Sequence, residues 1–272
     1  MSKQGRTAIV TGSASGLGRA LAVRLARDGW RLALADIAKE ANRETLAMVE
    51  RAGGSGQCEP LDVSRLDDWL ALRDRLQSQW PQLDLLVNNA GIAGSGEVGG
   101  FPIDEWRRLL DVNLMGAVYG CHVFIGWLKN HPHRSHIINT ASLAAFAAAP
   151  TMAAYNVAKA GIVALSETLY AEAKKHGVGV TVLCPGFFST NLLLQGHFAN
   201  EDEKQLAQRM MQNSSFDAAH VAELAVRAMT RRRLYVVTGA KARWFWRIKR
   251  WFPRTYMNLL ARRYVKGLPE SF

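Results

Sequence analysis

Short apolar runs alternate along this chain with segments whose apolar positions recur at helical spacing. The apolar runs cover residues 7–10, 32–35, 57–61, 83–87, 136–139, 178–183 and 234–237. Between most of them the pattern predicts amphipathic helices, such as one from Leu17 to the neighbourhood of Gly29. Continuous Val, Ile and Leu runs separated by helices are typical of parallel strands buried on both faces. We therefore predict an α/β fold: a doubly wound, mostly parallel sheet of about seven strands with helices on both faces.

Polar residues, glycine and proline follow several predicted strands at the point where each strand ends. They are Gly12, Asp36, Asp62, Asn88, Ser142 and Pro185. In an open parallel sheet, ligands bind in a crevice outside the carboxyl ends of the strands. The pattern therefore predicts one site that is assembled from several loops.

A glycine-rich segment, TGSASGLG at residues 11–18, joins the first predicted strand to the first predicted helix. Gly12, Gly16 and Gly18 lack a Cβ atom, which permits a tight turn and lets backbone N–H groups approach a pyrophosphate. The TGxxxGxG spacing differs from the common GxGxxG. A purely structural turn is the alternative interpretation.

Asp36 ends the second strand, 18 residues after Gly18, close to the spacing of about 20 residues expected for a carboxylate that binds an adenosine ribose. Such a carboxylate accepts from both ribose hydroxyls and repels a 2′-phosphate. The neighbouring residue Ile37 carries no positive charge, so NAD is favoured over NADP. Arg19 and Lys39 are close enough in sequence to keep NADP open, and a strand-end turn is the structural alternative for Asp36.

Tyr155 and Lys159 are four residues apart in a segment, 153–170, with a helical pattern, so both side chains lie on one face. An ammonium beside a phenol is expected to lower its pKa from about 10 towards the working range. The pair predicts a general base for alcohol oxidation or a general acid for carbonyl reduction. A tyrosine and a lysine also occur at this spacing by chance.

Several motifs in order make the chain resemble the short-chain dehydrogenase/reductase family in its Rossmann-like form. They are TGSASGLG at 11–18, Asp62-Val63, Asn88-Asn89-Ala90-Gly91, Asn113 within DVNLMG, Ser142, Tyr155-x-x-x-Lys159, and Pro185-Gly186 followed by Thr190. The resemblance runs from Thr11 to the strand that ends near Val237.

The resemblance implies a role for each of these residues. Tyr155 would be the catalytic acid or base, Lys159 would tune it and bind the nicotinamide ribose, and Ser142 would polarise the substrate oxygen. Asn113 would bend its helix and fix a water in a proton relay from Lys159. The implied cofactor contacts are Gly12, Ser15, Gly16, Leu17, Gly18, Asp36, Asp62, Val63, Asn89, Ala90, Gly91, Tyr155, Lys159, Pro185, Gly186, Phe188 and Thr190.

Each of the polar residues also has a structural alternative, which is compatible with the catalytic one. Ser142 is suited to capping a helix, Asn88 and Asn89 to tying strand ends together, and Asn113 to satisfying a buried backbone group.

Composition places the chain among ordinary globular proteins, with 272 residues, 49% hydrophobic and 21% charged. The net charge of +11 is localised: residues 1–230 hold 22 basic and 22 acidic residues, whereas residues 231–272 hold 12 and 1. A neutral body with a basic tail indicates one docking surface, and not an anionic ligand bound throughout.

Cysteine spacing, histidine positions and the N-terminus indicate the cellular compartment and argue against disulfides and a metal site. Cys58, Cys121 and Cys184 lie far apart without metal-ligand spacing, so we expect no disulfide framework, no metal site and a reducing compartment. Histidines 122, 131, 133 and 136 are expected to be solvated surface residues. The N-terminus shows no signal-peptide pattern, and no run of 18 apolar residues suggests a membrane span.

The basic tail combines aromatic and charged residues at helical spacing. In the run 242–252, the residues Trp244, Phe245, Ile248, Trp251 and Phe252 are predicted on one side, Arg243, Arg247 and Arg250 on another, and Trp246 out of register. Pro253 is expected to end or kink this helix, and residues 256–264 suggest a second amphipathic segment. An anionic membrane surface, bound through residues 241–265, is the favoured partner. Packing on the enzyme or on a second subunit remains open, and nucleic acid is the least favoured partner.

These features together predict a catalytic domain at residues 1–237, a substrate flap at 191–215 and a basic, aromatic extension at 238–272. The expected reaction transfers a hydride between NAD(P) and a secondary alcohol or ketone, or a primary alcohol or aldehyde, with NAD preferred and a hydrophobic substrate. An NADPH-preferring carbonyl reductase and a non-catalytic nucleotide-binding scaffold are the alternatives. We expect a homodimer or homotetramer in the cytoplasm, peripheral at the membrane.

Overall fold

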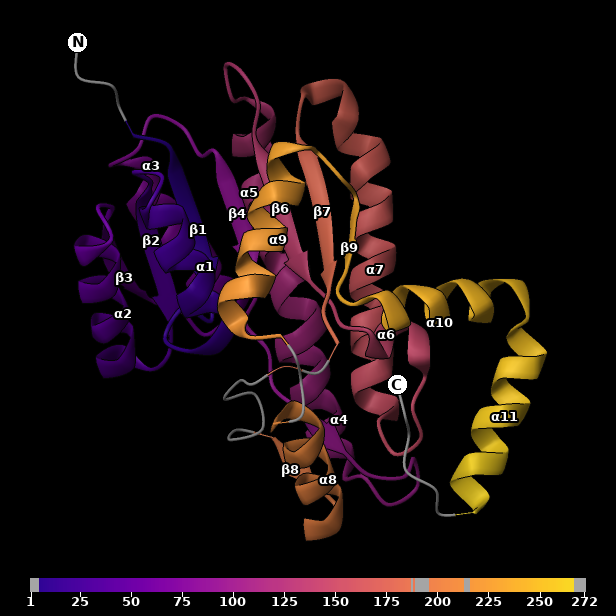
Figure 1. The fold of residues 1–272 in the computed structure, drawn as a ribbon. Helices are drawn as coiled ribbons and strands as arrows, with labels where there is room; N and C mark the ends of the chain where they lie inside the picture. Colours follow the sequence, from indigo (N-terminus) through magenta and orange to yellow (C-terminus); the bar gives the residue numbers. More distant parts are fainter. Residues whose placement is uncertain (1–4, 187, 189–195, 213–215, 267–272) are drawn as a thin grey trace.

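The computed structural model describes residues 5–186, 188, 196–212 and 216–266. Seven parallel strands form its central sheet in the order β3-β2-β1-β4-β6-β7-β9 (Figure 1). The strands are β1 (Thr7–Thr11), β2 (Arg31–Asp36), β3 (Ser55–Pro60), β4 (Leu85–Asn88), β6 (His136–Thr140), β7 (Gly179–Cys184) and β9 (Tyr235–Val237). Every hydrogen-bonded neighbour pair in this sheet is parallel. The predicted doubly wound α/β fold is confirmed.

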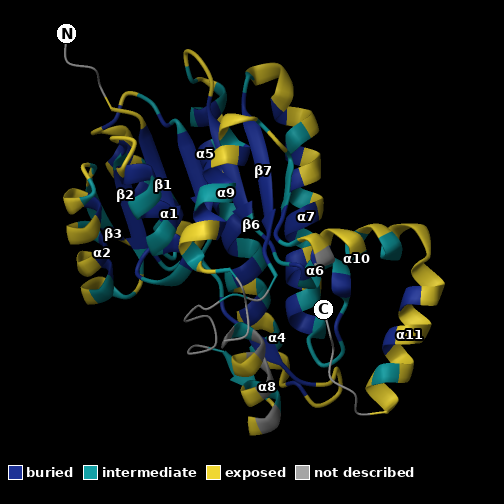
Figure 2. Cartoon of the chain, in the orientation of Figure 1, coloured by how far each residue is buried: buried dark blue, intermediate teal, exposed yellow. Residues whose placement is uncertain are grey.

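Helices cover both faces of the sheet. Helices α1 (Gly16–Ala26), α2 (Lys39–Arg51) and α9 (Ala218–Thr230) pack on one face, and α3 (Leu66–Gln77), α5 (Gly116–Lys129) and α7 (Ala153–Ala173) pack on the other. Alternate residues of β1 supply the two layers: Ala8 and Val10 contact the first group, whereas Ile9 contacts the second. All three are fully buried. This two-sided burial explains why the strands appear in the sequence as continuous apolar runs. In Figure 2 the central strands of the sheet are buried, while the edge strands β3 and β9 are partly exposed and these helices expose their outer faces.

One continuous helical segment, Ile103–Lys129, has the length and hydropathy of a membrane span, with a mean hydropathy of 1.4 over its most apolar window. It consists of α4 (Ile103–Leu110), a π-helical turn (Asp111–Met115) and α5. In the fold this segment packs against α3, α7 and β4, as core helices of soluble proteins do.

A small second sheet was not predicted. It pairs β5 (Gly94–Ser95) with β8 (His197–Phe198) in parallel, just before α8 (Glu201–Gln212). The predicted flap at 191–215 corresponds in its described part to β8 and α8; residues 191–195 and 213–215 lie outside the described residues. Ser95 Oγ donates to the Glu203 carboxylate of α8 at 2.5 Å.

After β9 the chain forms two helices that we call the C-terminal arm: α10 (Ala240–Trp251) and α11 (Pro253–Val265). Pro253 occupies the first turn of α11, as its missing N–H group favours. In Figure 1, α10 leads away from the sheet and α11 turns sharply from its end. Trp246, which the pattern left out of register, packs on the body: its ring centroid lies 5.2 Å from that of Phe146 and 5.1 Å from that of Tyr235.

Two of the four histidines expected at the surface are buried, so that prediction is wrong for them. The His131 side chain is 3% exposed and bonds Asp84 at 3.1 Å, and His136 bonds Thr181 Oγ1 at 2.9 Å. Burial lowers the pKa of His136 to about 3. Among the described residues no group of three or more metal-binding side chains is found.

Candidate active site

The glycine-rich turn joins β1 to α1 at the carboxyl edge of the sheet. Gly12 and Gly16 have φ angles of +65° and +51°, in the left-handed region that favours glycine. A Cβ atom on Gly18 would collide with the Gly12 carbonyl oxygen. Ser15 occupies the N-cap position of α1, and Leu17 is buried in its first turn. The turn is therefore a bare backbone cradle at a helix N-terminus, which fits a pyrophosphate.

The carboxylate of Asp36 is fixed beside this turn. Its two oxygens accept from the backbone N–H groups of Ala14 and Ala38, each at 2.9 Å. Asp36 is only half-buried at the end of β2. The predicted strand-end role is thus present.

The side chain of Arg19, which could have bound a 2′-phosphate, points to α2. Its guanidinium donates to Thr45 Oγ1 at 2.9 Å, to the Ala41 carbonyl at 3.1 Å and to the Glu44 carboxylate at 3.3 Å. A further bond of 2.5 Å joins it to the Ala14 carbonyl. These four contacts hold the charge in place, so moving it to a phosphate would break several of them.

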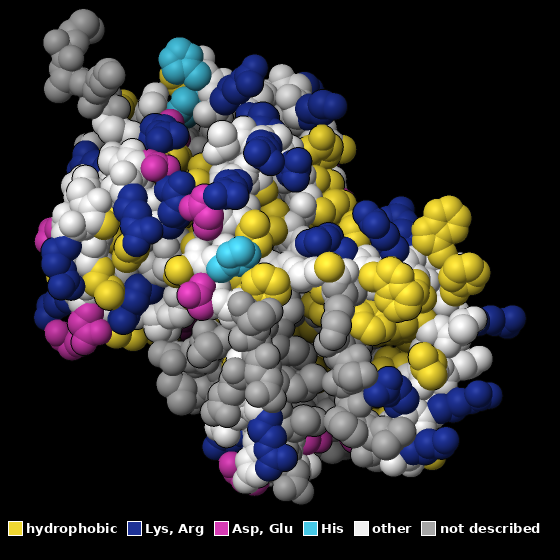
Figure 3. Space-filling view, in the orientation of Figure 1, with side chains coloured by type: hydrophobic (Ala, Val, Ile, Leu, Met, Phe, Trp, Pro, Cys, Tyr) yellow, Lys and Arg dark blue, Asp and Glu magenta, His cyan; other side chains and the backbone are white. Residues whose placement is uncertain are grey.

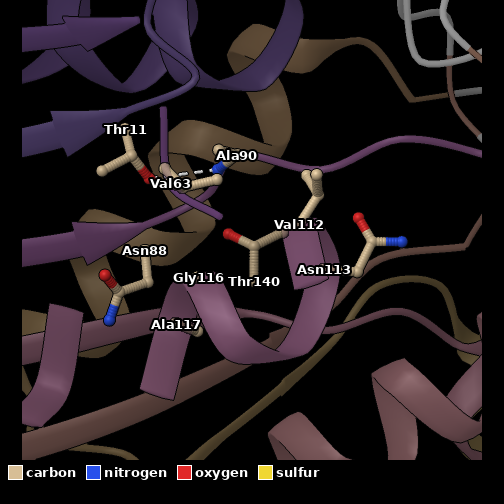
Figure 4. A pocket seen from close by; sticks show the side chains of 9 residues that line it. All are labelled: Thr11, Val63, Asn88, Ala90, Val112, Asn113, Gly116, Ala117 and Thr140. Atoms are coloured by element: carbon tan, nitrogen blue, oxygen red, sulfur yellow. Dashed lines mark hydrogen bonds between the residues drawn. The ribbon is translucent and has the colours of Figure 1, made fainter. Parts of the chain in front are cut away.

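Asp62 and Val63 follow β3 on the adenine side of the predicted site. Asp62 Oδ1 accepts from the backbone N–H and hydroxyl of Ser64, at 3.0 and 2.6 Å, and Val63 is buried. Val63 borders a small cavity behind the crevice (Figure 4). The cavity is lined by Thr11, Val63, Asn88, Ala90, Val112, Asn113, Gly116, Ala117 and Thr140.

The segment Asn88-Asn89-Ala90 ties strand ends together. The backbone N–H groups of Asn89 and Ala90 donate to Thr11 Oγ1 at 2.9 and 3.1 Å (Figure 4), and Asn89 Nδ2 donates to the Thr11 carbonyl at 3.0 Å. Asn88 Nδ2 donates to Asn139 Oδ1 at 2.9 Å. The structural alternative for both asparagines is therefore correct, and it leaves the backbone of Ala90 at the crevice.

Sequence reasoning did not name Thr11 or Thr140 as site residues, although Thr11 begins the glycine-rich segment. Thr11 and Thr140 both line the cavity, and the Thr140 carbonyl holds the site lysine. Each threonine is the last residue of a buried strand. That position, the same one that singled out Asp36, is the signal that could have identified them.

Asn113 lies in the π-helical turn between α4 and α5, where the resemblance implied a helix bend. Its amide both accepts from the Ile92 N–H and donates to the Ile92 carbonyl, each at 2.8 Å. A Cβ atom on Gly91 would lie 2.8 Å from Asn113 Oδ1 and 3.5 Å from Lys159 Nζ. Asn113 therefore places the Gly91 backbone directly beside Lys159.

Three of the four predicted catalytic side chains, those of Ser142, Tyr155 and Lys159, lie together between β6 and α7. Tyr155 is the third residue of α7, and Ser142 lies close enough to its hydroxyl to lower the pKa of the phenol. Ser142 Oγ accepts from the N–H of Ala144, the first residue of α6, at 3.2 Å, whereas the N-cap position itself is occupied by Leu143. Lys159 Nζ donates to the Thr140 carbonyl at 3.0 Å and lies 5.6 Å from the centre of the Tyr155 ring.

The electrostatics differ from the expectation that Lys159 depresses the pKa of the phenol. Burial raises the pKa of Tyr155 to about 12, and its hydrogen bond with Ser142 opposes that rise. Burial also lowers the pKa of Lys159 to about 8. The prediction was wrong for this arrangement because both groups lose water, which disfavours the charged form of each.

The loop after β7 completes the crevice as far as it is described. The Pro185 carbonyl accepts from the Leu143 N–H at 2.8 Å, which ties this loop to the Ser142 segment. Gly186 and Phe188 are half-buried. Thr190, the last implied cofactor contact, lies outside the described residues.

The sequence matches the short chain dehydrogenase family over residues 6–201. With the parallel sheet and the site above, this match shows that the chain belongs to the short-chain dehydrogenase family and has the Rossmann-like fold of an oxidoreductase.

Two similar proteins, an oxidoreductase and a dehydrogenase by name, agree with this assignment. The chain is 33% identical over 232 residues to the protein named "Probable oxidoreductase EphD" of Mycobacterium tuberculosis, which covers 82% of this chain but only 39% of the length of that relative. It is also 33% identical over 209 residues to 3beta-hydroxysteroid dehydrogenase 1 of Eggerthella lenta, over 76% of this chain and 80% of that protein.

A solved structure is similar over the whole chain, the C-terminal arm included. It is a short chain dehydrogenase/reductase from Burkholderia phymatum in complex with NAD, with a TM-score of 0.86 and 27% identity, covering 100% of this chain and 99% of that one.

Proposed function

We propose that this protein is an NAD-dependent oxidoreductase that interconverts a hydrophobic secondary alcohol and its ketone, or a primary alcohol and its aldehyde. The observation that carries the proposal is the convergence of Ser142, Tyr155 and Lys159 on one crevice beside the glycine-rich turn. A scaffold that only bound a nucleotide would have no need for these three groups together.

In this proposal, Ser142 and Tyr155 hold the substrate oxygen between their hydroxyl groups. For oxidation, Tyr155 takes the hydroxyl proton; for reduction, it returns the proton to the carbonyl oxygen. When bound, the nicotinamide supplies or receives the hydride. Lys159 holds the nicotinamide ribose and exchanges the proton with solvent through a relay at Asn113, and the carbonyl of Thr140 aims its ammonium.

NAD is the cofactor that the site favours over NADP. The Asp36 carboxylate stands at the ribose position, where it repels a 2′-phosphate, and Arg19 is held by α2. The glycine-rich turn and the segment at Ala90 would hold the pyrophosphate and the adenosine. That the Burkholderia phymatum relative binds NAD supports this choice.

The substrate is proposed to be a hydrophobic molecule, such as a long-chain, steroid-like or retinoid-like alcohol. The activity in the name of the Eggerthella lenta relative supports a steroid-like alcohol. The sequence after Thr190 also has three leucines, 192–194, which lie outside the described residues. The test is a screen of the purified protein against hydrophobic alcohols and ketones with NAD, NADH, NADP and NADPH. Absence of nucleotide binding and of turnover with every pair would overturn the proposed function.

The outer face of the C-terminal arm is proposed to contact an anionic membrane surface. Trp244, Trp251 and Phe252 are 60%, 78% and 61% exposed, and Trp244 and Trp251, seven residues apart, share one face of α10. Figure 3 shows hydrophobic side chains over α10 and its turn into α11, beside Lys and Arg. Exposed indole rings with basic neighbours suit the interface of an anionic bilayer. Because this surface is basic, two copies of it would repel each other, so a membrane is favoured over a second subunit as its partner.

We also propose that the enzyme is a homodimer or homotetramer in the cytoplasm. Exposed apolar side chains on the helices outside the arm support an assembly: Ile103 of α4 is 65% exposed and Val157 of α7 is 51% exposed. Sedimentation of the purified protein tests this.

A further inference from the structure

The segment between Ser142 and Tyr155 contains strained backbone. Ala148 and Thr151 have φ angles of +53° and +60°, and Arg232 is the other non-glycine residue of the described chain with a positive φ. Such angles are unfavourable for residues with a Cβ atom and persist only where the surroundings hold them. Two of them therefore lie within the short connection from α6 (Ala144–Ala147) to α7.

Residues of α7 and of the segment after β5 hold the second half of this connection, residues 149–151. Asn156 Nδ2 donates to the Ala149 carbonyl at 2.8 Å. The backbone N–H of Gly96 donates to the Thr151 carbonyl at 2.6 Å. The Thr151 hydroxyl lies 3.2 Å from Ser95 Oγ and donates to it, because the Ser95 proton goes to Glu203.

The C-terminal arm holds the first half. Lys249 Nζ donates to the Phe146 carbonyl, and the Tyr256 hydroxyl donates to the Ala147 carbonyl at 2.9 Å. The Trp246 ring packs on Phe146. The two carbonyls belong to the last residues of α6, where a helix leaves its acceptors unpaired and a positive charge is favourable. Tyr256 is 7% exposed, so its hydroxyl is a buried contact.

The arm reaches the other side of the same region as well. The Tyr264 hydroxyl donates to the Glu97 carboxylate at 2.5 Å, two residues after β5. Glu97 follows Gly96, which bonds Thr151. The arm thus contacts the end of α6 and also Glu97, the neighbour of the segment 95–96 that holds Thr151.

We propose that the inner face of the arm is an intramolecular brace, in which Lys249 and Tyr256 are positioning residues that hold Ser142 against Tyr155. The Ser142 side chain accepts from the N–H of Ala144, the first residue of α6. Anchoring the other end of α6 therefore fixes the direction of the Ser142 hydroxyl. This assignment rests on the proposed function for its kinetic consequence, but the contact itself does not.

Loss of the brace is expected to affect only how the enzyme handles the alcohol or carbonyl substrate, and not how it binds NAD. The glycine-rich turn and Asp36 lie on β1 and β2, on the other half of the sheet, and share no described contact with the arm. Loosening the brace is expected to leave NAD affinity unchanged and to weaken only the steps that need Ser142.

The experiment compares three full-length variants with the wild type. Tyr256→Phe and Lys249→Met each remove one donor, and Tyr170→Phe is the matched control, a hydroxyl removed about 22 Å further along α7 from Tyr155. For the best alcohol found in the substrate screen, the first two variants are expected to lose about tenfold in kcat/KM, the order of effect that one hydrogen bond has. NAD affinity, followed by the quenching of tryptophan fluorescence, stays constant, and Lys249→Arg restores the rate.

A second measurement does not depend on turnover. Amide hydrogen exchange of residues 143–152 is expected to accelerate in Tyr256→Phe and Lys249→Met, while residues 7–20 and the control variant exchange as in the wild type. Unchanged exchange at 143–152, or an equal loss of NAD affinity and alcohol turnover, overturns the brace. Faster exchange in a protein that turns over no alcohol supports the contact and overturns only the proposed function.

Discussion

Lys159 lies beneath Tyr155 in α7, with its ammonium 5.6 Å from the centre of the phenol ring and bonded to the Thr140 carbonyl at 3.0 Å. The ammonium therefore faces the strand end, while Ser142 lies near the phenol hydroxyl and lowers its pKa. Each of the two residues has its own partner, and their functions in a dehydrogenase are separable by mutation.

Replacing Tyr155 by Phe is expected to lower kcat by about 10²–10⁴-fold, because the acid or base is lost while the ring remains packed. The affinity for NAD should stay within about twofold, since the glycine-rich turn and Asp36 are untouched. Steady-state rates and NAD titrations measure the two effects. Near wild-type turnover in this variant would remove Tyr155 from the mechanism.

The rate of alcohol oxidation is expected to rise with pH, because the phenolate of Tyr155 is the base and burial raises its pKa to about 12. The hydrogen bond from Ser142 lowers that pKa. Ser142→Ala should therefore move the rise in kcat/KM to higher pH, whereas Ser142→Thr, which keeps the hydroxyl, should not. The profile of kcat/KM between pH 6 and about 11 tests the sign; a shift to lower pH contradicts it.

Asp36→Ala is expected to weaken NAD binding by about tenfold and to reduce discrimination against NADP, because the ribose acceptor and the repelling charge are both removed. The change also frees the N–H groups of Ala14 and Ala38. Asp36→Asn keeps one acceptor and separates the loss of charge from the loss of these bonds. Dissociation constants for NAD and NADP are the readout, and an unchanged ratio argues against Asp36 as the selective residue.

Asn113→Ala is expected to destabilise the protein by about 1–3 kcal/mol, since it leaves the buried N–H and carbonyl of Ile92 without the amide that pairs with both. Urea unfolding measures the change. Asn258→Ala, on the exposed face of α11, is the matched control and should stay within about 0.5 kcal/mol of the wild type. Equal stability of the two variants would mean that the π-helical turn holds without Asn113.

Trp244→Ala with Trp251→Ala is expected to reduce binding to vesicles that contain phosphatidylserine by at least about tenfold, because two exposed indoles leave the outer face of the arm. Co-sedimentation with these vesicles and with neutral phosphatidylcholine vesicles separates the apolar contribution from the charge. Raising the salt should release the wild type from the anionic vesicles. Equal binding of wild type and variant leaves the arm without a membrane role.

The local sequence pattern was sufficient to predict the strands, the glycine-rich turn and the helix that carries Tyr155. The apolar run at residues 7–10, for example, predicted β1 because a strand buried on both faces must be apolar at every position. The family motifs identified Asn113, and the structure adds that its amide is consumed by Ile92, 21 residues away. No periodicity encodes that contact.

The sequence by itself determined which residues form the sheet and which chemical groups stand at its carboxyl edge, because burial periodicity and turn chemistry are properties of neighbouring residues. The tertiary structure alone decided the environment of those groups. Burial set the pKa of Tyr155 and Lys159, and the inner face of the arm joined residues as far apart as Ala147 and Tyr256, which are 109 positions apart. Such contacts depend on how whole elements pack, and the local pattern does not contain that information.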